Sequence, residues 1–524
     1  MARVVGVLLA AIAAAVAAVE AAETESQSSY IVHVVAEHAP RPRLLARALP
    51  VGISRPAPRL LYSYAHDATG FAARLTGRQA VHLASRRSSV LAVVPDATRQ
   101  QLQTTLTPSF LGLSASSGLL PRSNAATDVV IGVIDSGVYP EDRSSFAADA
   151  ALPRPPGKFR GACVSTPAFI TSAYCNNKLV GARFFYQGYE AAHGRLDETK
   201  EFKSPLDTIG HGTHAASTAA GSAVADAAFF DYAKGKAIGM APGARIAAYK
   251  AWWTKGCTDS DVLIAFEVAV ADGVDVISVS LAASKAPKFY KDNTAETSAP
   301  ASVVLGNGET FTGTSIYAGV PLGEAKLPLV YGGDVGSNVC EAGKLKASLV
   351  AGKIVVCDPG VSARAAKGET VKLAGGAGAI FVSSEDFGEQ AMTTAHILPA
   401  TAVTFADAEK IKKYISSNAS PVATIQFHGT VVGKTPSSPR MASFSSRGPN
   451  RRAPEILKPD VTAPGLDILA AWTGENSPSQ LDSDTRRVKF NIISGTSMSC
   501  RTWASRHCSS RRGQTGATPR SSPR

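Results

Sequence analysis

The sequence predicts an α/β protein whose main domain is a doubly wound parallel sheet. A continuous apolar run of strand length ends on Asp135, as in a strand that is buried on both faces, and residues 245–251 and 274–281 also read as strands. Residues 259–271 carry apolar side chains at helical spacing between the last two strands. This alternation of strand, helix and strand favours parallel strands with helices packed on the sheet.

Three short motifs supply a carboxylate, an imidazole and a hydroxyl. Asp135 ends the first apolar strand, and a buried parallel strand delivers such a residue to the edge of its sheet. His211 opens a helix of small residues, and Ser497 follows Gly495 on a turn that can lead into a helix. Read alone, the serine motif is a capped turn. Together the motifs contain the nucleophile, base and orienting carboxylate of nucleophilic catalysis.

The three motifs, in the order Asp, His, Ser, resemble the subtilase family. Phe-Ser-Ser-Arg-Gly-Pro at 444–449 and Lys-Pro-Asp-Val-Thr-Ala-Pro-Gly at 458–465 resemble its plant-type branch. The resemblance covers nearly all of residues 28–500. It implies a serine endopeptidase that acts on a protein or peptide substrate without a cofactor or metal. Ser497 would attack the peptide carbonyl, His211 would move the proton, and Asp135 would orient His211.

A second histidine, His214, lies one helical turn after His211. We interpret it as structural rather than catalytic. A zinc site at the two histidines, with Asp207 beside them, would need a third ligand and a glutamate base at metalloprotease spacing, and neither is present.

The N-terminus has the form of a secretory signal peptide. Arg3 precedes an apolar run over 4–19, which is too short for a membrane span, and Ala21 and Ala22 follow it. We therefore expect a secreted, extracellular protein (in the apoplast or cell wall, if it comes from a plant) that does not associate with a membrane.

Residues 28–103 read as a small α+β unit, and Ser-Tyr-Ile-Val-His-Val with Gly-Phe-Ala-Ala-Arg-Leu resembles a subtilase propeptide. The resemblance implies an intramolecular inhibitor and self-cleavage between Gln103 and Thr104. An ordinary ferredoxin-like domain is the alternative.

The region between His211 and Ser497 contains an insertion that resembles a β-rich protease-associated domain. The resemblance implies partner or substrate contact, including homodimerisation. Separately, the resemblance of the catalytic domain to subtilases implies that the backbone of Ser280–Ala283 pairs with an extended substrate. The sequence thus predicts a signal peptide (1–22), a propeptide (28–103), two catalytic parts (104–318 and 433–500), the insertion (319–432) and a disordered basic tail (501–524).

Two departures from the family pattern predict impaired catalysis. Residues 282–299 hold neither a helix nor a strand, and the Ala-Gly-Asn-Ser-Gly-Pro loop whose asparagine donates to the oxyanion is missing. After Cys500 the family continues with a long apolar helix, whereas here Arg, Ser, Gly and Pro dominate. The alternative is a catalytically inactive secreted pseudoprotease that acts as a binding module.

The cysteines and one sequon fit an extracellular protein. Cys163 with Cys175, and Cys340 with Cys357, bracket short loops and are candidate disulfides. Cys257, Cys500 and Cys508 remain without obvious partners. Asn418-Ala419-Ser420 is an N-glycosylation sequon.

The net charge of +12 at first suggests a nucleic-acid partner. Six arginines and no acidic residue fall in 501–524, so half of the excess lies in the tail. Because no basic stripe with interleaved aromatic residues occurs elsewhere, we do not expect nucleic-acid binding.

Overall fold

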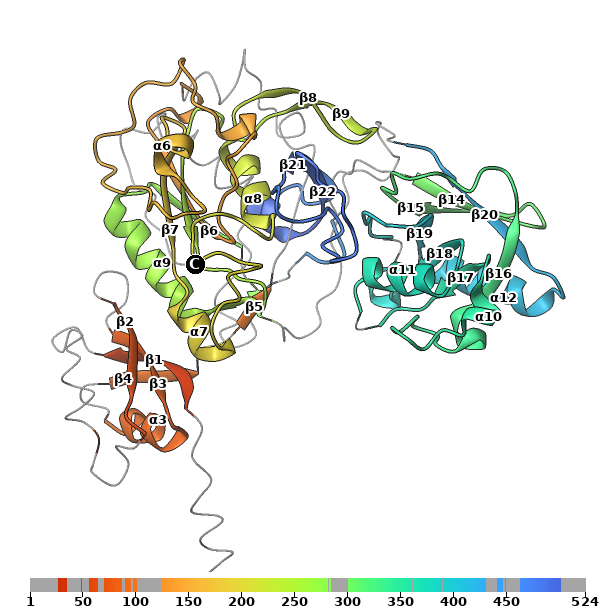
Figure 1. Cartoon of the computed structure of the whole chain (residues 1–524), viewed down its shortest axis with the longest axis horizontal. Helices are drawn as coiled ribbons and strands as arrows, with labels where there is room; N and C mark the ends of the chain where they lie inside the picture. The colour runs from red at the N-terminus through yellow and green to blue at the C-terminus, as the bar shows by residue number, and fades with distance from the viewer. Residues whose placement is uncertain are drawn as a thin grey trace, which may run out of the picture. The chain divides into compact units, whose positions relative to one another are not determined.

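The computed structural model describes residues 27–34, 49, 56–64, 70–86, 90–95, 98–100, 124–280, 282–283, 300–360, 362–388, 390–429, 441–445, 448 and 462–500 (Figure 1). Five predicted features lie outside these residues: the signal peptide, the Gln103–Thr104 bond, most of 282–299, Cys508 and the tail 501–524. The chain forms two compact units. The first comprises Met1–Thr98, Phe185–Leu196 and Cys257–Val270, and the second comprises the remainder.

The first unit contains an antiparallel sheet in the order β2-β3-β1-β4. Its elements are β1 (Ser28–Val34), β2 (Arg59–Tyr64), β3 (Gly70–Leu75), α3 (Gly77–Ala84) and β4 (Val90–Pro95). Helix α3 begins with a capping box, because the Thr76 side chain accepts from the Gln79 amide while the Gln79 side chain accepts from the Thr76 amide. The sheet and helix bury a core that includes Val32, Phe71 and Leu83.

In the same unit the sheet packs on helices α7 (Gln187–His193) and α9 (Asp259–Asp272). The Asp261 carboxylate, which is buried, accepts the N–H groups of Gly188 at 2.9 Å and Tyr189 at 2.7 Å at the start of α7. The Tyr62 hydroxyl of β2 donates to the same carboxylate. These hydrogen bonds join the sheet to both helices through the Asp261 side chain. Burial raises the pKa of Asp261.

The second unit is built on a parallel sheet in the order β12-β6-β10-β7. Its strands are β6 (Val130–Asp135), β7 (Leu179–Phe184), β10 (Arg245–Lys250) and β12 (Val276–Val279). Every residue of β6 and β10 is buried, which explains the apolar sequence of β6 before Asp135 and the apolar residues between Arg245 and Lys250 in β10. The α/β class is thereby confirmed, and the doubly wound arrangement stays a prediction.

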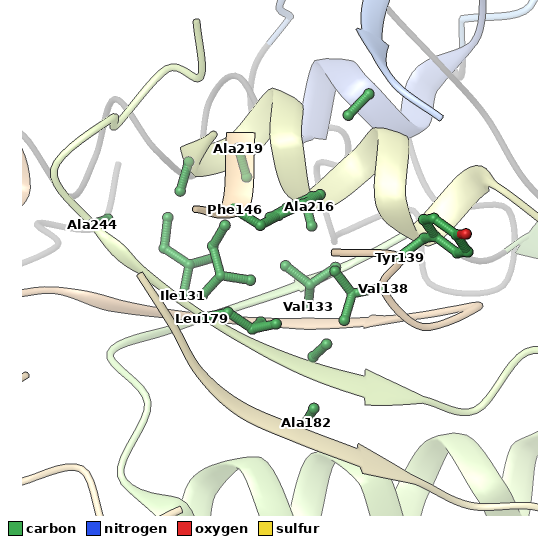
Figure 2. Close-up of a cluster of buried hydrophobic side chains, with 14 of the residues drawn as sticks. Ile131, Val133, Val138, Tyr139, Phe146, Leu179, Ala182, Ala216, Ala219 and Ala244 are labelled. Atoms are coloured by element: carbon green, nitrogen blue, oxygen red, sulfur yellow. The ribbon is translucent and has the colours of Figure 1, made fainter. Parts of the chain in front are cut away.

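Helix α8 (His211–Ala220) covers one face of this sheet. Its small residues Ala216 and Ala219 pack against Ile131, Val133 and Leu179. Figure 2 shows these side chains filling the layer between the helix and the strands. Because alanine is small, the helix axis can approach the sheet closely, and this brings the start of α8 next to the end of β6.

Strand β12 is less well covered than its neighbours. Among the described residues it pairs with β6 alone, and three of its four residues are only partly buried. A strand with the sequence Val-Ile-Ser-Val is expected to be buried on both faces. The exposed edge immediately precedes the stretch in which the sequence lacks the family's next helix and strand.

Residues 300–427 form a closed barrel in the order β14-β15-β19-β18-β17-β16-β20 (Figure 1). Its strands are β14 (Pro300–Leu305), β15 (Thr310–Thr314), β16 (Leu327–Tyr331), β17 (Ile354–Cys357), β18 (Gly378–Val382), β19 (Ala400–Val403) and β20 (Val422–Phe427), and its helices are α10 (Ala347–Val350), α11 (Arg364–Leu373) and α12 (Phe405–Ser417). The barrel is β-rich, as expected for the insertion. However, the barrel begins before the boundary predicted between 318 and 319. Strands β14 and β15 lie before that boundary and belong to the barrel, since residues 301–305 of β14 pair with β20 and β15 pairs with β14.

The remaining elements of the second unit are short. They include α6 (Thr171–Tyr174), β8 (Val224–Phe229), β9 (Tyr232–Ala237), β13 (Ala282–Ala283), β21 (Ile468–Ala471) and β22 (Phe490–Ile493); β5 (Thr98–Gln100) spans the border of the two units, and β11 (Cys257–Thr258) belongs to the first. The prediction that 282–299 contains no strand is wrong at β13, which pairs with β5. Backbone pairing requires no side-chain pattern, so two alanines gave no signal.

Both predicted disulfides are confirmed. Cys163 and Cys175 are bonded with a Cα–Cα distance of 6.7 Å, and Cys340 and Cys357 with 5.5 Å. In the described part of the chain, Cys257 and Cys500 take part in no disulfide. None of the helices in that part is both long and apolar enough to span a membrane.

Candidate active site

The structure brings Asp135, His211 and Ser497 together in the second unit. Nδ1 of His211 lies 2.7 Å from Oδ1 of Asp135, and Nε2 lies 3.1 Å from Oγ of Ser497. All three residues are at most 1% exposed. Since a carboxylate only accepts hydrogen bonds, Nδ1 carries a proton and donates it to Asp135. In the neutral ring Nε2 is then the acceptor that faces the serine hydroxyl.

Asp135 is held at the carboxyl end of β6 by its own backbone and by the following turn. The N–H of Ser136 donates to Oδ1 at 2.7 Å. The carbonyl of Asp135 accepts from the amides of Ala251 and Trp252, which follow the neighbouring strand β10. Because β6 and β10 run in parallel register, their ends meet at one edge of the sheet, and the carboxylate is fixed there.

His211 is the first residue of α8, and a glycine on each side allows it to sit close to the Asp135 turn. Gly210 has φ +108°, a conformation that L side chains rarely adopt. The N–H of Gly212 donates to Oγ of Ser136 at 2.8 Å. A β-carbon at Gly212 would lie 2.8 Å from the backbone nitrogen of Gly137 and closer still to its carbonyl oxygen. The glycines therefore permit the backbone approach that places His211.

Ser497 lies in a helical segment over residues 496–500 that follows β22. The Gly495 amide donates to the Gly465 carbonyl at 2.8 Å and fixes the turn before it. The hydroxyl of Ser280, just after β12, donates to the Ser497 carbonyl at 3.1 Å. These contacts tie the serine backbone to both neighbouring segments.

Two residues after Ser280, the chain pairs as a strand with an earlier segment. Ala282 and Ala283 of β13 lie opposite Gln100 and Arg99 of β5 in antiparallel register. The residues of β13 belong to the stretch that the family resemblance assigns to substrate pairing. An extended piece of the chain's own N-terminal part thus occupies a position that an extended peptide could take.

His214 has hydrogen-bond partners different from those of His211. It is fully buried, and its Nε2 donates to the Ile468 carbonyl at 3.1 Å. Burial lowers the pKa of His214 to about 3, so the ring is neutral at physiological pH. It joins α8 to β21, which agrees with a structural interpretation. Among the described residues, no three His, Cys, Asp or Glu side chains gather in a way that could hold a metal ion.

Sequence reasoning missed the residues that hold the turn after Asp135 and the start of α8 in place. Asp207, Ser136 and Thr213 are buried beside them and are hydrogen-bonded to one another. Each stands next to a recognised motif, but nothing in its local pattern distinguishes it from an ordinary turn or helix residue. Their only sequence signal is their distance of a few positions from Asp135 or His211.

Comparisons with known proteins agree with this geometry. A model of the subtilase family matches residues 126–505, and a model of the peptidase inhibitor I9 family matches residues 15–101, which confirms the predicted propeptide. The subtilisin-like protease SBT1.4 of Arabidopsis thaliana is 47% identical over 533 residues, covering 91% of this chain and 67% of the relative. The subtilisin-like protease SBT1.5 of the same plant is 43% identical, covering 90% of this chain and 68% of the relative. The chain thus spans about two thirds of the length of these relatives. It belongs to the subtilase family.

Proposed function

We propose that this chain is a secreted serine endopeptidase whose catalytic residues are Asp135, His211 and Ser497. The observation that carries the proposal is the pair of distances around one imidazole, 2.7 Å to the carboxylate and 3.1 Å to the serine hydroxyl. Both lie within the range that proton transfer requires. Family membership gives the arrangement its chemistry, and the plant relatives are named proteases.

In the proposed mechanism, Nε2 of His211 takes the proton of the Ser497 hydroxyl as its oxygen attacks the peptide carbonyl. The imidazolium that forms is stabilised by the Asp135 carboxylate, which also keeps the ring in the tautomer with its proton on Nδ1. His211 then gives its proton to the leaving amine, and the acyl-enzyme is hydrolysed by water through the same steps. This chemistry involves no cofactor.

The N-terminal sheet and the strand β5 act in this proposal as an intramolecular inhibitor. Gln100 and Arg99 pair with β13 in the manner of an extended substrate, and the chain continues from there toward the expected cleavage site at Gln103–Thr104. Occupation of the substrate strand would block other peptides until the propeptide is cut and released.

The proposal includes a low catalytic rate. Residues 282–299 contain no Ala-Gly-Asn-Ser-Gly-Pro loop, and removal of the corresponding oxyanion donor in subtilisin lowers kcat about 10²–10³-fold. The incomplete cover of β12 supports the same conclusion, because it shows apolar sheet surface beside the gap. The inactive binding module that the sequence also allows has no observation of its own in its favour.

The remaining parts of the proposal rest on sequence and resemblance. The signal peptide predicted over 1–22 and the two disulfides support secretion. The barrel at 300–427 supports a protease-associated insertion that contacts substrates or a second copy of the chain. Asn418 is exposed at the end of α12, as an N-glycosylation site requires.

Expression of the chain in a secretory host tests the proposal. A fluorophosphonate probe should label wild type slowly and leave Ser497→Ala unlabelled, since only an activated serine reacts. A precursor uncut at Gln103–Thr104 should accumulate in both. Wild type without any Ser497-dependent labelling would refute the serine peptidase assignment. Efficient release of the mature fragment from wild type, but not from Ser497→Ala, would refute the low rate.

A further inference from the structure

One buried carboxylate outside the three catalytic residues accepts five hydrogen bonds. Asp207 has no exposed surface. Its Oδ1 accepts from the Ser136 hydroxyl at 2.9 Å and from the amides of Ile209 at 3.0 Å and Gly210 at 2.8 Å. Its Oδ2 accepts from the amide and the hydroxyl of Thr213, at 2.8 and 2.5 Å. All five partners are donors, so the site is built for a carboxylate.

The hydroxyl of Ser136, the residue after Asp135, connects this turn to Gly212, the residue after His211. Ser136 Oγ donates to Asp207 and accepts the N–H of Gly212 at 2.8 Å. The amide of the same Ser136 donates to the Asp135 carboxylate. Ser136 therefore fixes Asp135 through its backbone and the start of α8 through its side chain.

The hydroxyl of Thr213 makes a similar bridge between α8 and the segment that follows Asp135. Thr213 Oγ1 donates to Asp207 Oδ2 and accepts the N–H of Tyr139 at 3.0 Å. Tyr139 belongs to the turn that follows Asp135, while Thr213 lies in the first turn of α8. Each hydroxyl can accept from the opposite segment because its own proton goes to Asp207, so the two bridges share one acceptor.

The backbone of Asp207 is anchored to the same surroundings. Its N–H donates to the Val138 carbonyl at 3.1 Å, and its carbonyl accepts the Thr473 hydroxyl at 2.6 Å. The adjacent Leu206 carbonyl accepts from the buried ammonium of Lys250, the strand residue opposite Asp135. The carboxylate cannot shift without breaking these contacts.

We propose that Asp207 is a positioning residue that sets the distance between Asp135 and His211. It does so by orienting the hydroxyls of Ser136 and Thr213, which hold the turn after Asp135 against the first turn of α8. The inference rests on the proposed function, because it assumes that the bond between Asp135 and His211 serves catalysis. A role limited to capping α8 would use the amides of 209–213 alone and would not require hydroxyl bridges to another segment.

The test compares Asp207→Asn with Asp484→Asn in the full chain. Asparagine has the same shape but only one acceptor oxygen, so bonds on one side of Asp207 are lost. Asp484 is a matched control, since it is also buried and accepts from Ser479 and from three nitrogens of Arg486. Proton NMR follows the downfield resonance of the His211 Nδ1–H that donates to Asp135. The rate of fluorophosphonate labelling measures how reactive the Ser497 hydroxyl is in each variant.

We expect Asp207→Asn to fold, to lose the downfield resonance and to label about 100-fold more slowly, because an error of about 1 Å has that effect. Asp484→Asn should keep the downfield resonance and the wild-type labelling rate. A folded Asp207→Asn with an unchanged resonance would overturn the inference, as would equal loss in the control. If Asp207→Asn does not fold, Thr213→Val should lose the resonance and Thr213→Ser should keep it, and retention in both would overturn the inference. A wild type that shows the resonance without labelling refutes the proposed function alone.

Discussion

Replacing Gly212 by alanine should push helix α8 away from the turn that follows Asp135. The new methyl group would lie 2.8 Å from the backbone nitrogen of Gly137 and nearer to its carbonyl oxygen. Both are backbone atoms, so no side chain can rotate away. Gly212 itself lies in the helix, where alanine is intrinsically better by about 1 kcal/mol. A loss of stability or activity in Gly212→Ala would therefore come from the close approach of the two backbones and not from helix propensity.

The size of the effect follows from these distances. Ordinary contacts between non-bonded atoms begin near 3.5 Å, so relief of the contact with the Gly137 nitrogen alone requires a separation of about 0.7 Å, and the nearer carbonyl oxygen requires more. If the whole of that minimum shift lay along the bond from His211 to Asp135, the bond would lengthen from 2.7 Å to at least about 3.4 Å, outside the range of about 2.6–3.2 Å that proton transfer needs. Overpacking costs about 1–3 kcal/mol of stability, which the helix propensity offsets in part.

Two measurements on one preparation test this. Thermal unfolding should show a small loss of stability, while the rate of Ser497 labelling should fall by about 100-fold. Gly235→Ala is the control, because no atom lies within 4 Å of the added β-carbon and the position is in the exposed strand β9. A Gly212→Ala protein that labels at the wild-type rate would refute the argument that this glycine sets the position of His211.

Two further predictions concern stability. Burial lowers the pKa of His214 and His396 to about 3, with Arg364 and Arg486 adding to the effect at His396. The unfolded chain takes up these protons from about pH 6.5 downward, so the free energy of unfolding should fall between pH 6.5 and 3 by up to about 1.4 kcal/mol per pH unit for each histidine. His396→Phe should remove the contribution of His396 to this pH dependence. The denaturation midpoints at pH 7 and pH 5 should then differ by less than in the wild type, and an unchanged difference would contradict the prediction. Replacing both Cys340 and Cys357 by alanine opens a loop of 17 residues and should cost about 3 kcal/mol in denaturant unfolding; equal midpoints in the parent and the double variant would count against that value.

The sequence by itself determined the elements that depend on local pattern. The apolar run that ends on Asp135 predicts a buried strand, and β6 is buried throughout because both faces of the sheet demand apolar residues. The small residues after His211 predict a closely packed helix, and α8 lies directly on the sheet. The cysteine pairs were also predictable, since only a short loop separates each pair.

Only the tertiary structure decided what holds these elements together. Asp207 is 71 positions away from Ser136 in sequence, and their hydrogen bond exists because β6 and α8 pack on each other. Likewise β14 joins the barrel by pairing with β20, more than a hundred residues later, and two alanines in β13 form a strand because β5 lies opposite them. Such bonds are made between backbone atoms or between polar groups that any turn could contain. Their partners are therefore set by the packing of distant segments, which a local pattern does not encode.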